Sequence, residues 1–287
     1  MMTAATPGVP VRRKHLRKPG AYVLIAIEWL VALAFIAPLL WVLLNSLKSN
    51  MEIIYTPFWF GATLRFKNYV NVWNGGIGRA FLNSTIVVFG ALPLSLGASC
   101  MASYVLARVP FRGRTLLVYF FLGGLMVPTL LGIIPLFVFL NKLGLFNSYV
   151  GLILVYGTYM LPFNIYLMLP FFRGIPRELE EAAQIDGCSL LQMFRLIVLP
   201  LTWPVIGAAA IFNFVTCWTE YLYALVFTSD MRTLPVQVVN VMDRLRVQSD
   251  YGQLFAALVI ATIPTIVVLR LFERRMVKTV RFGGIKG

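Results

Sequence analysis

The chain has 287 residues, of which 59% are hydrophobic and only 13% charged, and its mean hydropathy is +0.81. Soluble globular domains carry about 25% charged residues, so the composition excludes an ordinary soluble protein. Three cysteines in so long a chain exclude a secreted disulfide scaffold, and the apolar content excludes a disordered chain. The formal charge of +14, from 25 basic and 11 acidic residues, suggests a nucleic-acid partner unless the positions of the charges explain it.

Six stretches with at most one charge are long enough to cross a bilayer as helices, which takes about 20 apolar residues. Backbone groups in lipid must be hydrogen-bonded internally, so runs of this length favour helices over a transmembrane β-barrel, whose strands alternate over about ten residues. We therefore expect an all-α membrane protein with six transmembrane helices. The expected cores are residues 22–44, 81–106, 115–140, 149–170, 203–227 and 254–272.

The expected spans form one membrane domain, residues 22–272, between a basic tail over residues 1–21 and a second tail over residues 273–287. A basic segment before the first apolar run is also typical of a signal peptide. The run is longer than the 7–15 residues of such signals, and no small-residue cleavage site follows it. We expect a helix that stays in the protein.

Lysine and arginine are divided unequally between the two sides of the predicted membrane domain. With six spans both termini lie on one side, and that side holds 17 of the basic residues against 8 on the other. Positive residues gather in cytoplasmic loops, so both termini are expected in the cytoplasm. Topology and contact with anionic lipid then explain the excess charge, and no nucleic-acid partner is expected.

The third loop on the cytoplasmic side, residues 171–201, is too long for a simple turn and is strongly patterned. Pro176 suits the first turn of a helix, Gly187 permits a break, and helical periodicity returns from Leu190 until Pro200. A short amphipathic helix exposed at the membrane surface is suited to docking in a groove of another protein.

Four of the eleven acidic residues fall within nine positions of this loop. Such a group could serve acid/base catalysis, but no other candidate catalytic residue accompanies it, so contact with a partner is favoured. The four are Glu178, Glu180, Glu181 and Asp186.

The same loop resembles the EAA motif of ATP-binding-cassette importer permeases, with every position of the pattern filled. The matching residues are Glu181, Ala182, Ala183, Gly187, Ile197, Leu199 and Pro200. The resemblance implies the type I importer permease fold. It also implies that these residues, with Asp186, form a coupling helix that seats in a cleft of an ATPase subunit.

Motifs along nearly the whole chain are similar to the carbohydrate-uptake branch of that family, among them residues 104–108, 134–136 and 283–287. The closing Gly-Gly-Ile-Lys-Gly resembles the Gly-Ala-Val-Lys-Gly-like tail of one of the two permeases in that branch. The resemblance implies that Gly283, Lys286 and Gly287 contact the ATPase. The chain departs from the tail of that branch at Gly284 and Ile285.

The resemblance implies a non-catalytic subunit in the inner membrane of a bacterial cell. Its implied partners are a second homologous permease, two ATP-binding-cassette ATPase subunits and an extracytoplasmic solute-binding protein. The sequence has no phosphate-binding loop and no His/Cys cluster at metal-ligand spacing. No cofactor or metal is therefore expected in this chain, and ATP and magnesium would be bound by the partner ATPase.

Polar and aromatic residues inside the predicted spans are candidates for the substrate pathway. Amides either hydrogen-bond sugar hydroxyls or join helices, and the sequence does not decide between these uses. An acidic residue near a membrane boundary is either hydrated or functional. The candidates are Asn83, Asn164, Asn213, Trp218, Glu220 and Tyr221.

Two alternatives stay open. The same architecture could import a polyamine, a glycerol phosphate or a peptide, because the loop motif does not specify the substrate. The chain could also be an ATP-independent secondary transporter, which should show a coupling-ion site among carboxylates near the midplane. Apart from Glu28 and Glu220, both near membrane boundaries, the predicted spans contain no such carboxylate.

Overall fold

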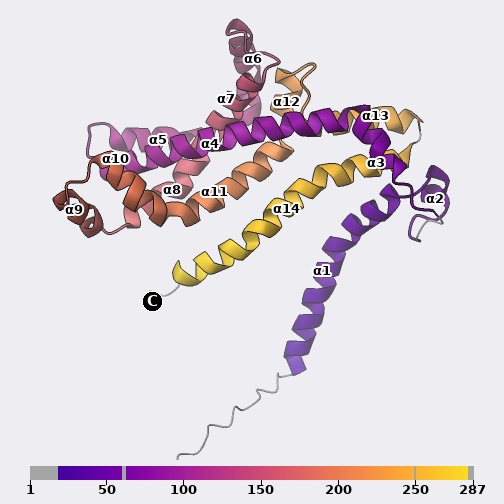
Figure 1. Ribbon diagram of the computed structural model, residues 1–287, viewed down its shortest axis with the longest axis horizontal. Helices are drawn as coiled ribbons and strands as arrows, with labels where there is room; N and C mark the ends of the chain where they lie inside the picture. Colours follow the sequence, from indigo (N-terminus) through magenta and orange to yellow (C-terminus); the bar gives the residue numbers. More distant parts are fainter. Residues whose placement is uncertain (1–18, 60–62, 249, 284–287) are drawn as a thin grey trace, which may run out of the picture.

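The computed structural model describes residues 19–59, 63–248 and 250–283, and its regular structure is entirely helical in these ranges (Figure 1). This confirms the predicted all-α class. The helices are α1 Pro19–Ser46, α2 Asn50–Tyr55, α3 Lys67–Val72, α4 Gly78–Arg108, α5 Arg114–Gly124, α6 Ile133–Lys142, α7 Tyr149–Tyr159, α8 Leu161–Gly174, α9 Arg177–Ile185, α10 Leu190–Met193, α11 Leu199–Thr219, α12 Leu222–Phe227, α13 Leu234–Gln248 and α14 Tyr251–Gly283. Short π-helical turns over Trp73–Ile77 and Phe194–Val198 precede α4 and α11, and a 3-10 turn over Thr129–Gly132 precedes α6.

Four helical segments among the described residues are long and apolar enough to cross a membrane. They are Leu24–Ser46, Lys67–Arg108, Leu190–Thr219 and Tyr251–Phe272. Helices α7 and α8 meet at a bend of 43° and make a fifth span if the pair is counted as one. The structure thus bears out a helical membrane protein with four or five candidate spans, where the sequence predicted six.

The prediction of a single helix over residues 115–140 is wrong. The chain there forms the shorter helices α5 and α6, separated at residues 125–128. Two glycines, Gly123 and Gly124, close α5 and lower its helical propensity. Pro128 then lacks an N–H group and disfavours the helical conformation of Val127, so the helix cannot continue.

The helix expected over residues 203–227 is also interrupted. Helix α11 ends at Thr219, and α12 begins at Leu222. The carboxylate of Glu220 accepts hydrogen bonds from the backbone N–H groups of Tyr223 (2.8 Å) and Ala224 (3.1 Å). A carboxylate at this position satisfies the free amides of a helix N-terminus, so Glu220 stabilises the start of α12.

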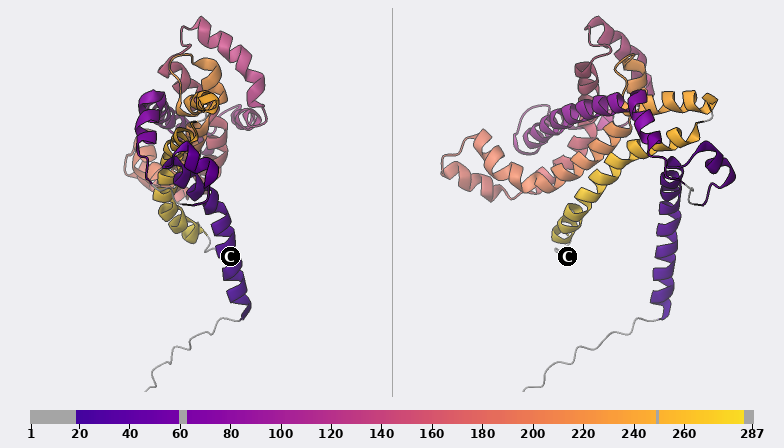
Figure 2. Two further views of the ribbon diagram at one scale, coloured as in Figure 1. Left: turned by 90° about the vertical axis from the view of Figure 1, so that its right-hand side faces the viewer. Right: turned by 45° about the vertical axis from the view of Figure 1, so that its right-hand side comes forward.

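Helix α4 is the centre of the fold, and α7, α8 and α11 pack along it (Figures 1 and 2). Ser95, Ser99 and Ser103 are spaced four residues apart, lie on one face of α4 and are fully buried. Small side chains let neighbouring helices approach closely. Asn164 of α8 donates a hydrogen bond to the Ser95 hydroxyl (2.9 Å), which fixes the crossing point of the two helices.

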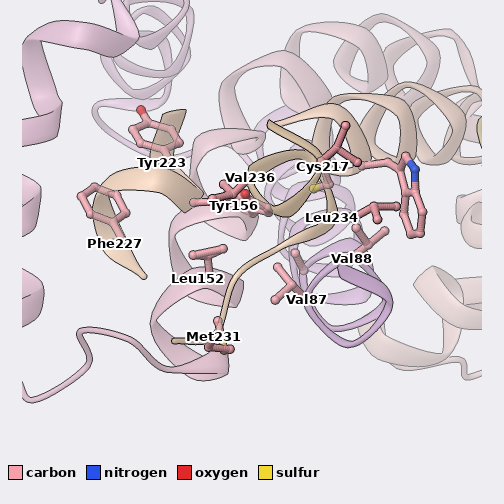
Figure 3. Packing of buried hydrophobic residues seen from close by; sticks show 14 of the residues in the cluster. Val87, Val88, Leu152, Tyr156, Cys217, Tyr223, Phe227, Met231, Leu234 and Val236 are labelled. Atoms are coloured by element: carbon pink, nitrogen blue, oxygen red, sulfur yellow. The ribbon is translucent and has the colours of Figure 1, made fainter. Parts of the chain in front are cut away.

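Buried side chains form two clusters along α4. In the first cluster, Leu152 and Tyr156 of α7 lie near Val87 and Val88 of α4 (Figure 3). The second cluster joins the C-terminal half of α4 to α8 and to the start of α11. This second cluster carries the loop that the sequence singles out as functional.

Helix α1 extends away from the other helices and contacts them near its C-terminal end (Figure 2). The junction there is held by Lys48, which is buried and donates hydrogen bonds to Asn45 Oδ1 (3.2 Å) and to the carbonyls of Thr56 (3.0 Å) and Pro57 (3.2 Å). Burial lowers the pKa of this ammonium group, and Glu52 opposes the change. Most apolar side chains of α1 are left uncovered within the chain, which suits contact with lipid or another subunit.

Candidate functional site

Helices α9 and α10 protrude at one end of the molecule, next to the turn that joins α4 to α5 (Figure 1). We call residues 177–200 the EAA segment. Helix α9 begins directly after Pro176 and has Glu178 and Glu180 in its first turn, where negative charge complements the helix dipole. The helix–turn–helix predicted for this loop is confirmed.

Gly187 forms the turn between the two helices. Its φ of +81° lies in the left-handed region, which glycine adopts without steric cost. The N–H of Cys188 donates to the Ala183 carbonyl (2.9 Å), and the N–H of Gly187 donates to the Gln184 carbonyl (3.0 Å). This pair of bonds is the Schellman arrangement, which satisfies the last carbonyls of α9 and fixes the turn.

Helix α10 begins with a capping box. The N–H of Ser189 donates to Gln192 Oε1 (2.7 Å), and the N–H of Gln192 donates to Ser189 Oγ (3.4 Å). The chain then continues through the π-helical turn at Phe194–Val198 directly into α11. From α10 onward, the EAA segment and the membrane helix α11 are therefore one continuous helical path.

The C-terminal part of the EAA segment packs into the second buried cluster. Phe194 lies against the Tyr104 ring of α4, with ring centroids 5.1 Å apart. Val198 is fully buried, while Ile197 and Leu199 are half-buried. These motif positions thus anchor the segment in the membrane domain, whereas Pro200 is exposed at the start of α11.

An ion pair joins α9 to α4. Arg108 Nε lies 2.9 Å from Glu180 Oε1, and the two side chains are only 8% and 13% exposed. The guanidinium group also donates to the carbonyl of Ile175, the residue that ends α8. Arg108 therefore fixes α9 against the ends of both α4 and α8.

The outer surface of the EAA segment is uncovered. Glu181, Ala182 and Asp186 are exposed, whereas Ala183 faces inward and is buried. Several large apolar side chains are also uncovered, and Ile185 is 87% exposed. Exposed apolar groups bordered by carboxylates are typical of a protein-binding surface. The other uncovered apolar residues are Leu179, Leu190 and Leu191.

Two of the candidate pathway amides join helices. Asn83 Nδ2 donates to the carbonyl of Arg232 (2.8 Å), and its Oδ1 accepts from the Tyr149 hydroxyl (2.8 Å). Asn164 bonds to Ser95, as described above. Both amides are buried and hold elements together, which was one of the two uses that the sequence left open.

Trp218 and Glu220 also bond within the chain. The indole N–H of Trp218 donates to the Ala261 carbonyl (3.0 Å) and so joins α11 to α14. Besides its backbone contacts, Glu220 accepts a hydrogen bond from the buried Tyr156 hydroxyl (2.6 Å). Tyr221 is half-buried between α11 and α12.

Asn213 lacks the bond that Asn83 and Asn164 each donate through Nδ2, although Asn164 Oδ1 is also without a partner among the described residues. Asn213 is 1% exposed, and its Nδ2 group has no hydrogen-bond partner among the described residues. It lines a cavity of about 380 Å³ together with Thr216 and aromatic side chains, including Phe163 and Phe212, whose rings stack at 4.4 Å. Aromatic walls with a few polar groups are typical of small-molecule sites. The cavity is bordered on another side by residues 124–128, where the α5–α6 break occurs.

Of the tail residues, Gly283 is the last residue of α14, and Lys286 and Gly287 lie outside the described residues. Across the described ranges, no group of three or more His, Cys, Asp or Glu residues could hold a metal ion.

Sequence reasoning missed two features. The partner of Arg108 could not be found, because residues 72 positions apart meet only through the fold. The aromatic lining of the cavity was also missed, although Phe212 stands next to Asn213 and Phe163 next to Asn164 in the sequence. Aromatic residues are frequent in every span, so an aromatic residue next to an asparagine in the sequence does not by itself indicate a cavity.

Comparisons with known proteins identify relatives over most of the chain. The profile of the family described as "Binding-protein-dependent transport system inner membrane component" matches residues 92–282. A diacetylchitobiose uptake system permease protein of Streptomyces coelicolor is 41% identical over 86% of this chain and 83% of its own length. A trehalose/maltose transport system permease protein of Thermococcus litoralis is 31% identical over 90% of this chain and 94% of its own length.

A solved structure has the same fold. It is the crystal structure of a bacterial ABC transporter involved in the import of the acidic polysaccharide alginate. One of its chains matches with a TM-score of 0.76 at 22% identity, over 89% of this chain and 95% of that chain.

The ion pair between α4 and α9 can be tested by a double-mutant cycle. We expect Glu180→Leu to lower the stability of the protein by about 3 kcal/mol, because it leaves the buried Arg108 guanidinium without its countercharge. Adding Arg108→Met should restore most of this loss, since a buried ion pair and a well-packed apolar pair are similar in stability. Thermal unfolding in detergent measures both effects.

The matched control is Glu178→Leu, the same replacement at an exposed position of α9. It should cost less than about 1 kcal/mol. If the two leucine variants unfold at the same temperature, the ion pair does not hold α9 in place.

Proposed function

This chain belongs to the family of binding-protein-dependent transport system inner membrane components, and from that premise we propose that it forms half of the pathway of an ATP-driven importer for a sugar or oligosaccharide. Sequence reasoning had identified the same family. The chain is the non-catalytic permease subunit and carries no cofactor of its own. The relatives named above transport diacetylchitobiose, trehalose and maltose, which favours a carbohydrate over the polyamine, glycerol phosphate or peptide alternatives.

The observation that carries the proposal is the construction of the EAA segment. It presents an uncovered surface at one end of the molecule and is fixed by Arg108 to α4. After the Gly187 turn it continues from α10 without interruption into α11. An ATPase subunit docked on Glu181, Ala182 and Asp186 would therefore transmit its movement to a membrane helix. A secondary transporter has no use for such a docking segment.

The complete assembly that we propose has four partner subunits besides lipid. A second homologous permease completes the pathway, two ATPase subunits bind ATP and magnesium, and a solute-binding protein delivers the sugar from outside the cell. The C-terminal tail, with Gly283, Lys286 and Gly287, would add a further contact with the ATPase.

For the topology we propose six membrane crossings with both termini in the cytoplasm. The five candidate spans are supplemented by α5 and α6, which together cross the membrane as a broken helix. Non-helical backbone at membrane depth is tolerated where it is buried in protein or lines a cavity, and the α5–α6 break borders the Asn213 cavity. The distribution of 17 basic residues on one side and 8 on the other supports this orientation.

Transport would proceed by a two-state change of the helices. Closure of the ATPase dimer pulls the EAA segments together, and the rigid path through the π-helical turn tilts α11 relative to α4. Nucleotide biases one state and the loaded binding protein biases the other. The Asn213 cavity lies on α11 and would change its access from one side of the membrane to the other.

The turn at Gly187 provides a test of coupling. We expect Gly187→Val to reduce ATP-driven uptake about tenfold, because a β-branched residue is strained by roughly 1–2 kcal/mol or more in the left-handed region and would shift the turn. Gly187→Asn should keep most of the activity, since asparagine tolerates this conformation. Uptake and ATPase association are measured in the reconstituted transporter.

Gly174→Val is the control for added size, because a Cβ at either glycine meets open space and Gly174 has no left-handed conformation. It should retain uptake. Equal transport by the Gly187→Val and Gly187→Asn proteins would disprove the role of the turn.

Asn213 provides a test of the pathway. We expect Asn213→Leu to leave the thermal stability unchanged or higher, because it removes a buried amide group without a partner. Uptake should nevertheless fall about tenfold, because the variant loses one hydrogen bond to a sugar hydroxyl. The sugar is first identified by calorimetric screening of the solute-binding protein.

Asn83→Leu is the contrasting variant, since the Asn83 amide is bonded on both sides. It should lower the thermal stability. A result in which Asn213→Leu destabilises the protein and leaves uptake intact would show that Asn213 is a structural residue.

A further inference from the structure

A groove runs between α5 and α8 at the end of the molecule that carries the EAA segment. It has a volume of about 460 Å³ and is lined by Arg114, Thr115, Val118, Tyr119, Leu122 and Arg173. Arg114 is the first residue of α5, and Arg173 lies in the last turn of α8. The two arginines therefore come from opposite walls of the groove.

Neither guanidinium group has a countercharge among the residues that the structure describes. Arg108 takes Glu180 as its partner, but neither Arg114 nor Arg173 forms an ion pair within the described ranges. Arg114 Nη2 donates to the Ala107 carbonyl (3.0 Å), which holds its side chain beside the end of α4. A groove with two unneutralised guanidinium groups is complementary to an anion such as a phosphate.

Besides the hydroxyl groups of Thr115 and Tyr119, the rest of the groove lining is apolar. Val118 and Leu122 follow Arg114 at intervals of four residues and so lie on the same face of α5. Leu116, Tyr119 and Phe120 on the same helix are largely exposed, as expected of a helix that faces lipid. The ligand that fits has a phosphate at one end and a hydrocarbon chain at the other.

We propose that this groove binds an anionic phospholipid, with its phosphate between Arg114 and Arg173 and an acyl chain along Val118 and Leu122. The groove ends at Arg173, four residues before α9 begins. A bound lipid therefore bridges the α4–α5 turn and the C-terminal end of α8, next to the root of the EAA segment. The proposed topology implies that this lipid comes from the cytoplasmic leaflet. The binding of the lipid does not depend on that topology.

The test uses the assembled transporter in mixed micelles and measures bound phosphatidylglycerol by native mass spectrometry. Phosphatidylglycerol should bind the Arg114→Gln/Arg173→Gln protein roughly twenty-five-fold more weakly, from about a fivefold contribution of each arginine. Arg112→Gln is the matched control, because Arg112 is exposed in the same turn and does not line the groove. It should bind phosphatidylglycerol as the unmodified protein does.

Two further ligands separate the sources of the phosphate. Phosphatidylcholine with the same acyl chains should bind weakly, and soluble glycerol 1-phosphate should not compete at equal concentration. If the double variant fails to assemble, Arg173→Gln alone decides, because this arginine makes no hydrogen bond within the described chain, and about fivefold weaker binding is expected.

Unchanged binding in the arginine variants would overturn the proposal, and so would equal binding of phosphatidylcholine. Competition by glycerol 1-phosphate would overturn the lipid assignment in favour of a site for soluble anions. If the second permease subunit covers the groove, the unmodified assembly will contain no bound phosphatidylglycerol. That result would also contradict the proposal.

Discussion

The buried ion pair between Arg108 and Glu180 fixes the geometry on which the proposed coupling depends. Helix α9 has few apolar groups of its own to bury, and Ala183 is its only buried residue. Its position relative to α4 therefore comes from a charge-assisted contact at 2.9 Å, supported by the Ile175 carbonyl on the same guanidinium. A pair enclosed in this way is costly to break, because either partner alone would be an uncompensated buried charge.

With α9 fixed in this way, the path of the chain after it explains how a movement of the EAA segment could reach the membrane interior. Beyond the Gly187 turn, the chain continues from α10 through the π-helical turn into α11 without a break. Insertions of this kind are frequent at functional sites, where they alter the register of a helix without ending it. Asn213 lies on the far part of α11, so the proposed sugar cavity and the part of the EAA segment after the Gly187 turn belong to one helical path.

Much of the fold could be predicted from the sequence, because the bilayer imposes length and composition on every span. The long uncharged runs in α4 and α14 were found in this way, whereas the helix break at Gly187 was predicted from the glycine and the helical periodicity on either side of it. The interruption at Glu220 was not predicted. Its cause is a side chain that caps the next helix, and the length of an uncharged run does not indicate such hydrogen bonds. The α5–α6 break had a local signal in Pro128, which the length of the apolar run outweighed.

The functional site could likewise be predicted only in part from the sequence. Motif spacing located the EAA segment, whereas the use of each amide depended on partners that are distant in sequence. Asn83 and Asn213 look alike in their sequence surroundings, yet one is bonded on both sides and the other lines a cavity with its Nδ2 group free of partners within the described chain. The central claim concerns the EAA segment, and photo-crosslinking tests it most directly. A photoreactive phenylalanine replaces either Ile185 in α9 or Val247 in α13, both 87% exposed, in the assembled transporter. We expect an adduct with the ATPase from position 185 and none from position 247. Absence of the adduct at position 185 in every nucleotide state would show that the ATPase does not dock on the EAA segment.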